Sequence, residues 1–141
     1  MKLLLEEIIQ KKILILDGAM GTMIQKHKLQ EADYRGKSFS DHPKSQKGNN
    51  DLLTLSNPSI IKDIHLKYLE AGADIITTNT FNSNRISMAD YGMEEYVYEM
   101  NLNAARLAAG AIEYYERTEK DKPHFVAGTL GHGASLPATA A

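Results

Sequence analysis

The chain has 141 residues and a formal net charge of −2, and it contains no cysteine. This length suffices for one domain with a buried core, and a charge this close to zero gives no attraction to nucleic acid or anionic membranes. The lack of cysteine excludes disulfides, thiolate nucleophiles and thiolate metal ligands within the chain. These bounds favour a globular protein without nucleic-acid or membrane partners.

The N-terminal segment predicts a short amphipathic helix rather than a signal peptide. Its apolar stripe consists of Leu4, Leu5, Ile8 and Ile9. Glu6 and Glu7 interrupt the apolar run too early for the core of a signal peptide. No apolar run reaches membrane-spanning length, so the default location is cytoplasmic.

Three short apolar segments predict β-strands, at residues 13–16, 74–78 and 124–127. The first is apolar on successive residues, which is typical of a strand covered on both faces. Helical spacing predicts helices between these strands, at residues 20–27, 57–72, 84–91 and 94–118. Long helical crossovers of this kind connect parallel strands.

Residues 29–50 are polar and aperiodic, and a structureless loop of that length is usually functional or disordered. The helix that follows has Asn57 as its N-cap, Pro58 at its first position and Gly72 at its end. His65 lies beside the apolar stripe of this helix, which indicates a structural role. None of the scattered histidines has a metal partner at ligand spacing.

The order β-α-β-α-β fits either part of a (β/α)8 barrel or a doubly wound open sheet. In both architectures the active site lies at the carboxyl ends of the strands. Polar and glycine residues follow each predicted strand, at Asp17–Gly18, Thr77–Asn82 and Gly128–Gly131. They predict a rim that hydrogen-bonds a small polar ligand, although turn and capping roles fit Asp17 and the Thr77–Asn82 segment equally well.

Five segments, in their order and spacing, resemble the homocysteine-binding barrel at the start of cobalamin-dependent methionine synthases, within the homocysteine S-methyltransferase family. They are "LILDGAMGTMIQ", "KGNNDLL", "IHLKYLEAGADIITTNTFNSN", "MNLNAARLA" and "AGTLG". The resemblance implies the N-terminal β-α-β-α-β portion of a (β/α)8 TIM barrel, incomplete, and methyl transfer to homocysteine to form methionine. "GNNDLL" favours the cobalamin type over the betaine- and S-methylmethionine-dependent enzymes.

The resemblance also implies which residues contact homocysteine. Asp17 would bind the substrate ammonium, and the turn at Gly18 would bind its carboxylate. The implied substrate-binding residues are Asp17, Gly18, Thr78, Asn79, Thr80, Phe81, Asn82 and Gly128. No catalytic residue or metal ligand is assigned within this chain.

In the family, three cysteines on later strands hold a zinc ion that activates the substrate thiol, and separate domains bind cobalamin and folate. This chain has no cysteine and departs from the family pattern after residue 131. We expect residues 1–131 to form a partial barrel of three strands, residues 132–141 to be a non-matching tail, and the chain alone to be inactive. The alternative is a truncated, non-catalytic fragment or remnant that binds at most a ligand or a partner.

Overall fold

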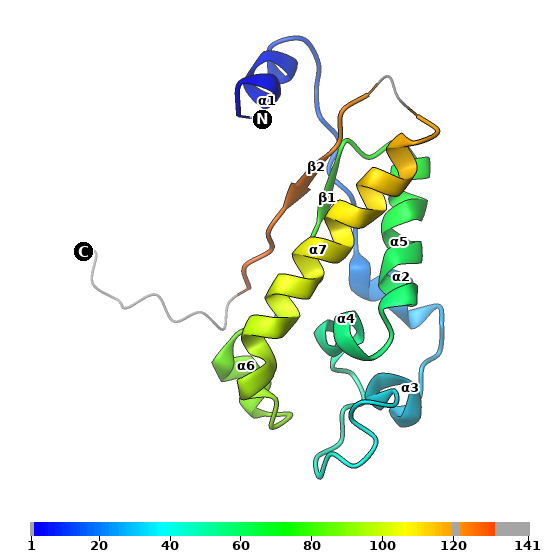
Figure 1. The fold of residues 1–141 in the computed structure, drawn as a ribbon, viewed down its shortest axis with the longest axis vertical. Helices are drawn as coiled ribbons and strands as arrows, with labels where there is room; N and C mark the ends of the chain where they lie inside the picture. The colour runs from blue at the N-terminus through cyan, green and yellow to red at the C-terminus, as the bar shows by residue number, and fades with distance from the viewer. Residues whose placement is uncertain (1, 120–121, 132–141) are drawn as a thin grey trace, which may run out of the picture.

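The computed structural model describes residues 2–119 and 122–131. At its centre, β1 (Ile75–Thr77) and β2 (Phe125–Ala127) form a parallel sheet with Ile75 opposite Phe125 (Figure 1). Leu16 forms a parallel bridge to Ile75 on the other side of β1. The three predicted strand segments therefore lie side by side in chain order, whereas a doubly wound sheet would place the first between the other two.

The first predicted strand is shorter than expected, and the prediction that both its faces are covered is wrong for the described residues. Ile13 is 90% exposed and Ile15 is 58% exposed. The segment is nevertheless held to β1, because Asp74 and Ile75 donate their N–H groups to the Ile15 carbonyl at 2.8 and 3.1 Å. An apolar run predicts a strand, but its cover depends on which other segments pack against it.

The predicted helices are present, with ends that differ by a few residues. They are α1 (Lys2–Ile9), α2 (Met20–Gln25), α5 (Pro58–Glu70), α6 (Arg85–Ala89) and α7 (Val97–Glu116), the last preceded by the 3-10 turn η2 (Glu94–Tyr96). Pro58 opens α5 as predicted. Beyond its end, Gly72 has φ of +100°, a conformation that glycine adopts without steric cost.

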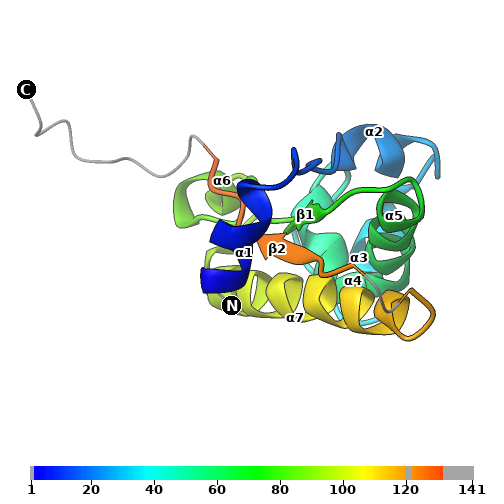
Figure 2. The ribbon, with the colours of Figure 1, turned by 90° about the horizontal axis from the view of Figure 1, so that it is seen from above.

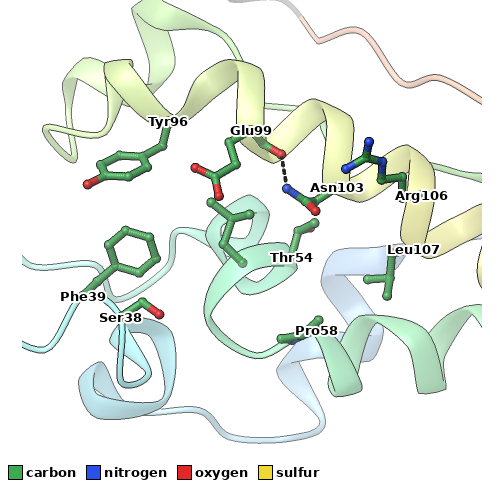
Figure 3. Close-up of a pocket in the computed structure, with 10 residues that line it drawn as sticks. Ser38, Phe39, Thr54, Pro58, Tyr96, Glu99, Asn103, Arg106 and Leu107 are labelled. Carbon is green, nitrogen blue, oxygen red and sulfur yellow. Dashed lines mark hydrogen bonds between the residues drawn. The ribbon is translucent and has the colours of Figure 1, made fainter.

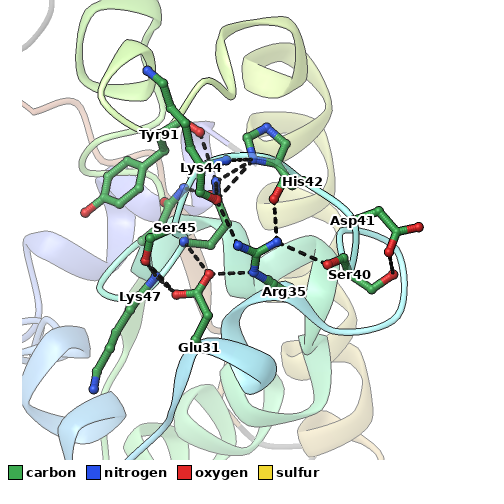
Figure 4. A network of polar contacts seen from close by, with 11 residues as sticks. Glu31, Arg35, Ser40, Asp41, His42, Lys44, Ser45, Lys47 and Tyr91 are labelled. Carbon is green, nitrogen blue, oxygen red and sulfur yellow. Dashed lines mark hydrogen bonds and ion pairs between the residues drawn. The ribbon is translucent and has the colours of Figure 1, made fainter.

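Residues 29–50 are not a structureless loop, and that expectation is wrong. They contain α3 (Glu31–Arg35) and run into η1 (Asn50–Leu52) and α4 (Leu53–Ser56). The Glu31 carboxylate accepts the N–H groups of Gln46 at 2.8 Å and Lys47 at 2.7 Å, and it pairs with Arg35 (Figure 4). The Gln46 N–H, followed by the other donors, lowers the pKa of Glu31 to about 2.

Helices α5 and α7 pack against each other and cover one face of the sheet (Figure 2). Ile76 of β1 lies in a core cluster with Leu69, Ala73, Ala108 and Ile112. One face of α7 is buried, at Met100, Ala104, Ala108, Ala111 and Ile112. Small alanine side chains allow a close approach between the helix and its neighbours.

The two ends of the sheet differ in what lies beside them. Figure 1 shows α1 near the end at which β1 and β2 begin, and α4 and α6 toward the end at which they finish. The polar segments that follow the strands therefore face α4 and α6. Among the described helices, none combines the length and apolar character needed to cross a membrane.

Candidate functional site

A cavity of about 320 Å³ lies at the carboxyl ends of the strands. It is lined by Gly18, Met20, Gly21, Asn50, Asp51, Thr77, Thr78, Asn79, Thr80, Phe81, Asn82 and Thr129. Eight of these twelve residues have a hydroxyl, amide or carboxylate side chain. Its volume is at the small end of the roughly 300–1,000 Å³ of typical ligand pockets.

Six of the eight predicted substrate-binding residues line this cavity: Gly18, Thr78, Asn79, Thr80, Phe81 and Asn82. The other two do not. Asp17 lies directly before the lining residue Gly18, and Gly128 is exposed, with its neighbour Thr129 on the cavity wall instead. The structure thus brings together the residues that follow the first strand segment, β1 and β2 along the chain.

Three threonines join the loops that follow β1 and β2. Thr129 donates its N–H to Thr78 Oγ1 at 3.0 Å, and Thr80 Oγ1 donates to the Thr129 carbonyl at 2.8 Å. The Thr78 and Thr80 hydroxyl oxygens lie 2.7 Å apart. Because each hydroxyl has one proton and that of Thr80 is already used, Thr78 donates to Thr80. The hydrogen bonds form a closed ring that fixes both loops.

The "GNNDLL" motif forms a further wall of the cavity. Asn79 donates its side-chain amide to the Asn50 carbonyl at 2.9 Å, and the Asn50 side chain accepts from the Tyr34 hydroxyl at 3.1 Å. The motif therefore connects the β1 loop to α3. The sequence alone had linked this motif only to the cobalamin type of enzyme. The contact with Asn79 places the motif at the cavity.

Asp51 is a lining residue that the sequence did not single out as part of the site. It is 3% exposed, and its Oδ2 accepts the Asn82 N–H at 2.7 Å and the Ser83 hydroxyl at 2.9 Å. Burial raises the pKa of Asp51, although these hydrogen bonds act in the opposite direction. The quoted motif contained this residue, but only the fold shows that its carboxylate reaches the β1 loop.

The Asp17 carboxylate accepts two hydrogen bonds from Thr77. Its Oδ2 accepts the Thr77 N–H and its Oδ1 accepts the Thr77 hydroxyl, both at 2.9 Å. Partial burial raises the pKa of Asp17, opposed by these two bonds. A carboxylate oxygen has two lone pairs, so Asp17 retains acceptor capacity for a cation while it joins the first strand segment to β1.

The mouth of the cavity is apolar on one side. Phe81 is 54% exposed, and the loop after β2 approaches it so closely that a Cβ added at Gly131 would overlap the Phe81 carbonyl oxygen. This close approach requires glycine at position 131. The predicted "GTLG" segment therefore closes one side of the site.

A larger cavity of about 600 Å³ lies elsewhere, between α7, α4 and the segment around Phe39 (Figure 3). Its walls include Tyr96, Glu99 and Arg106 of η2 and α7. Thr54 is on its wall and also lies 3.4 Å from the Asn79 amide. None of the predicted site residues lines it, and it opens within the helical layer rather than at the strand ends, where parallel α/β sheets bind ligands.

The described residues do not fit a metal ion. Among them, no three histidine, aspartate or glutamate side chains come close enough to hold one, and the whole sequence lacks cysteine.

A parallel α/β unit with a polar cavity at its strand ends defines a class of ligand-binding α/β proteins. The sequence matches the homocysteine S-methyltransferase family over residues 14–139, and the chain belongs to that family. Similar solved structures are those of the homocysteine methyltransferase MmuM from Escherichia coli. The metallated form has 25% identity and a TM-score of 0.70, and the oxidised form has 26% and 0.71.

Each comparison covers 90% of this chain but only 41% and 40% of the MmuM chains. The chain thus spans about two fifths of the length of these structures. The family match extends past residue 131, where the sequence predicts that a separate tail begins. Residues 132–141 lie outside the described residues, and the predicted boundary stays a prediction.

Proposed function

We propose that this chain forms the homocysteine-binding end of a homocysteine S-methyltransferase and corresponds to the first three strands of its (β/α)8 barrel. One observation carries the proposal: six residues predicted to contact homocysteine line a single cavity at the strand ends of a family member. The solved homocysteine methyltransferases with the same fold support it.

The chemistry of the cavity suits an amino acid. Homocysteine carries an ammonium, a carboxylate and a thiol. The buried carboxylate of Asp51 on the cavity wall suits the ammonium, since charge-assisted hydrogen bonds are the stronger ones. The half-buried carboxylate of Asp17 lies beside the cavity, directly before the lining residue Gly18, and could reinforce that contact. Hydroxyl and amide groups suit the carboxylate, and the exposed ring of Phe81 offers an apolar contact to the substrate chain.

By itself, the 141-residue chain binds substrate without methylating it. Methyl transfer needs a thiolate, and a free thiol has a pKa of about 8.5. The described residues provide no metal site and no cysteine ligand to lower that pKa. Zinc, a cobalamin methyl donor and the cobalamin and folate domains belong to the complete enzyme of the methionine synthase type, which the "GNNDLL" motif favours.

The proposal is tested by titrating the purified chain with homocysteine while amide chemical shifts are recorded. Shifts should change at residues 77–82 and at Thr129. Asp51→Asn retains an oxygen that can accept from Asn82 and Ser83 but removes the charge, and should weaken binding by about 1.5–3 kcal/mol. Glu99→Gln, a matched change in the larger cavity, should have no effect.

Two results would overturn the proposal: no shift change at millimolar homocysteine, or changes confined to the larger cavity. Activity is measured separately, with methylcobalamin, S-methylmethionine and zinc supplied in turn. Turnover of homocysteine by the isolated chain would contradict the proposed inactivity. Methylation by an enzyme completed with its later strands would identify the methyl donor.

A further inference from the structure

Two buried amide side chains, which we call the amide pair, lie directly before the motif residues that line the cavity. Gln46 is fully buried and Asn49 is 2% exposed. Asn49 Nδ2 donates to Gln46 Oε1 at 3.1 Å. The next two residues along the chain, Asn50 and Asp51, are on the wall of the cavity at the strand ends. The amide pair is therefore adjacent to the site in sequence, although its own side chains point into the protein interior.

The amide nitrogen of Gln46 anchors the pair to another part of the chain. It donates to the Tyr91 carbonyl at 2.9 Å and to His42 Nδ1 at 3.0 Å, one contact for each of its two protons. The His42 ring then carries its own proton on Nε2, which donates to the Gly92 carbonyl at 3.1 Å. The amide pair is thus fixed to the turn that follows α6.

The other member of the pair begins η1. Asn49 is the N-cap of this short helix, and its Oδ1 accepts the Leu52 N–H at 3.4 Å. Within η1, the Asp51 carboxylate accepts the Asn82 N–H of the β1 loop at 2.7 Å. The orientation of η1 therefore decides whether the Asp51 carboxylate meets that loop, and the amide pair fixes the residue from which η1 starts.

Stability alone does not account for two amides in this place. Replacing both partners of a buried hydrogen bond by apolar groups of the same shape can be nearly neutral. Apolar side chains fill space without fixing an orientation, whereas a fully satisfied polar network specifies one arrangement. Both polar atoms of Gln46 and both of Asn49 have partners. This completeness suits a network that sets the position of the segment after it.

We propose that Gln46 and Asn49 are positioning residues of the homocysteine site. Their hydrogen-bonded amides fix the start of η1, and η1 in turn holds the Asp51 carboxylate against the β1 loop at the cavity. The inference rests on the proposed function for the identity of the ligand, whereas the positioning itself is measured without ligand.

Hydrogen exchange in the absence of homocysteine tests the positioning. The Asn82 amide donates to Asp51 and reports whether that carboxylate is in place. The Ala108 amide, in the core of α7, reports unfolding of the whole chain. In Asn49→Ala, exchange at Asn82 should accelerate about tenfold more than exchange at Ala108. Equal acceleration at both amides, or none at Asn82, would overturn the proposal.

Two further variants separate the amide pair from helix capping, and a third is the control. Asn49→Ser keeps a good N-cap but lacks the amide that bonds Gln46, so Asn82 should exchange as fast as in Asn49→Ala. Gln46→Met, which is similar in length and has no amide, should have the same effect. Ser45→Ala removes a hydroxyl that bonds Glu31 at 2.7 Å in the same segment, and should leave exchange at Asn82 unchanged. Slow exchange in Asn49→Ser, or fast exchange in Ser45→Ala, would overturn the role of the pair.

A double-mutant cycle connects the positioning to the ligand. Asn49→Ala should weaken homocysteine binding about tenfold in the parent chain. In the Asp51→Asn background it should weaken binding less than about twofold, because it acts through the Asp51 carboxylate. Equal weakening in both backgrounds would overturn the proposal. If the parent chain does not bind homocysteine, yet exchange at Asn82 responds to Asn49→Ala as expected, only the substrate assignment is lost.

Discussion

Asp17 and Thr77 join the first strand segment to β1 through two hydrogen bonds, each 2.9 Å long. The same aspartate directs its backbone N–H to the Ile75 carbonyl. The residue that the sequence assigned to substrate binding is therefore also a structural link, and the two roles can be separated by mutation.

Asp17→Ala should lower the free energy of unfolding by about 1–3 kcal/mol, because it leaves the Thr77 N–H and hydroxyl without their partner. Asp17→Asn should lower it by less than about 1 kcal/mol, since the amide can accept from the N–H and donate to the hydroxyl. Urea unfolding of the two variants makes the comparison. Equal losses in both would show that the charge, rather than the pair of bonds, stabilises the segment.

Thr78→Val should destabilise the protein because it breaks the ring of threonine hydrogen bonds at the cavity. Thr78 is 7% exposed, and its loss leaves the Thr129 N–H without an acceptor in a partly buried place. The expected loss is about 1–3 kcal/mol in urea unfolding. Thr78→Ser keeps the hydroxyl and serves as the control; a serine variant as unstable as the valine variant would contradict the role of the ring.

The burial of His65 predicts that the protein becomes less stable at mildly acidic pH. It is fully buried, and neither ring nitrogen has a hydrogen-bond partner among the described residues. Burial lowers its pKa from 6.5 to about 4. The unfolded state therefore takes up a proton that the folded state rejects, and the stability present above pH 6.5 falls as the pH drops toward 4, by about 3 kcal/mol in all.

His65→Leu tests this origin. It should remove that part of the pH dependence and raise stability at pH 7, because an unpaired polar ring is replaced by an apolar side chain. The measurement is the difference in unfolding free energy between parent and variant at several pH values. A difference that does not change between pH 7 and pH 4 would contradict the assignment.

We predict that the Glu31 carboxylate stays charged in strong acid. Its pKa is lowered to about 2, chiefly by the Gln46 N–H, so its contribution to stability is complete above pH 4.5 and is lost as the pH falls toward 2. Carbon-detected titration of the side chain should give a midpoint near pH 2. A midpoint near 4 would show that the bonds to Gln46 and Lys47 do not form in solution.

The role of Glu31 can also be tested through the order of the segment that its hydrogen bonds hold in place. Glu31→Ala should increase cleavage by proteases within residues 40–47, because Gln46, Lys47 and Arg35 lose their common partner (Figure 4). Glu113→Ala is the matched control, since Glu113 forms an exposed ion pair with Arg117 at 3.6 Å and such surface pairs contribute little. Equal cleavage in both variants would contradict the role of Glu31.

Features that depend on neighbours along the chain could be predicted from the residues alone. Helical periodicity predicted α5 and α7, because a repeat of apolar residues specifies one face of a helix. Pro58 and Gly72 bounded α5 for local steric reasons. The polar residues after each strand predicted the site, because parallel strands bring their carboxyl ends together.

Features that depend on contacts between distant segments became visible in the folded chain alone. Asp51 belongs to the site because the fold brings it to Asn82, 31 residues away along the chain. Residues 29–50 are ordered through Glu31, whose partners at positions 46 and 47 show no periodic signal. Residues 13–16 are as apolar as a buried strand, yet Ile13 is exposed, because burial is a property of what packs against a segment and not of the segment alone.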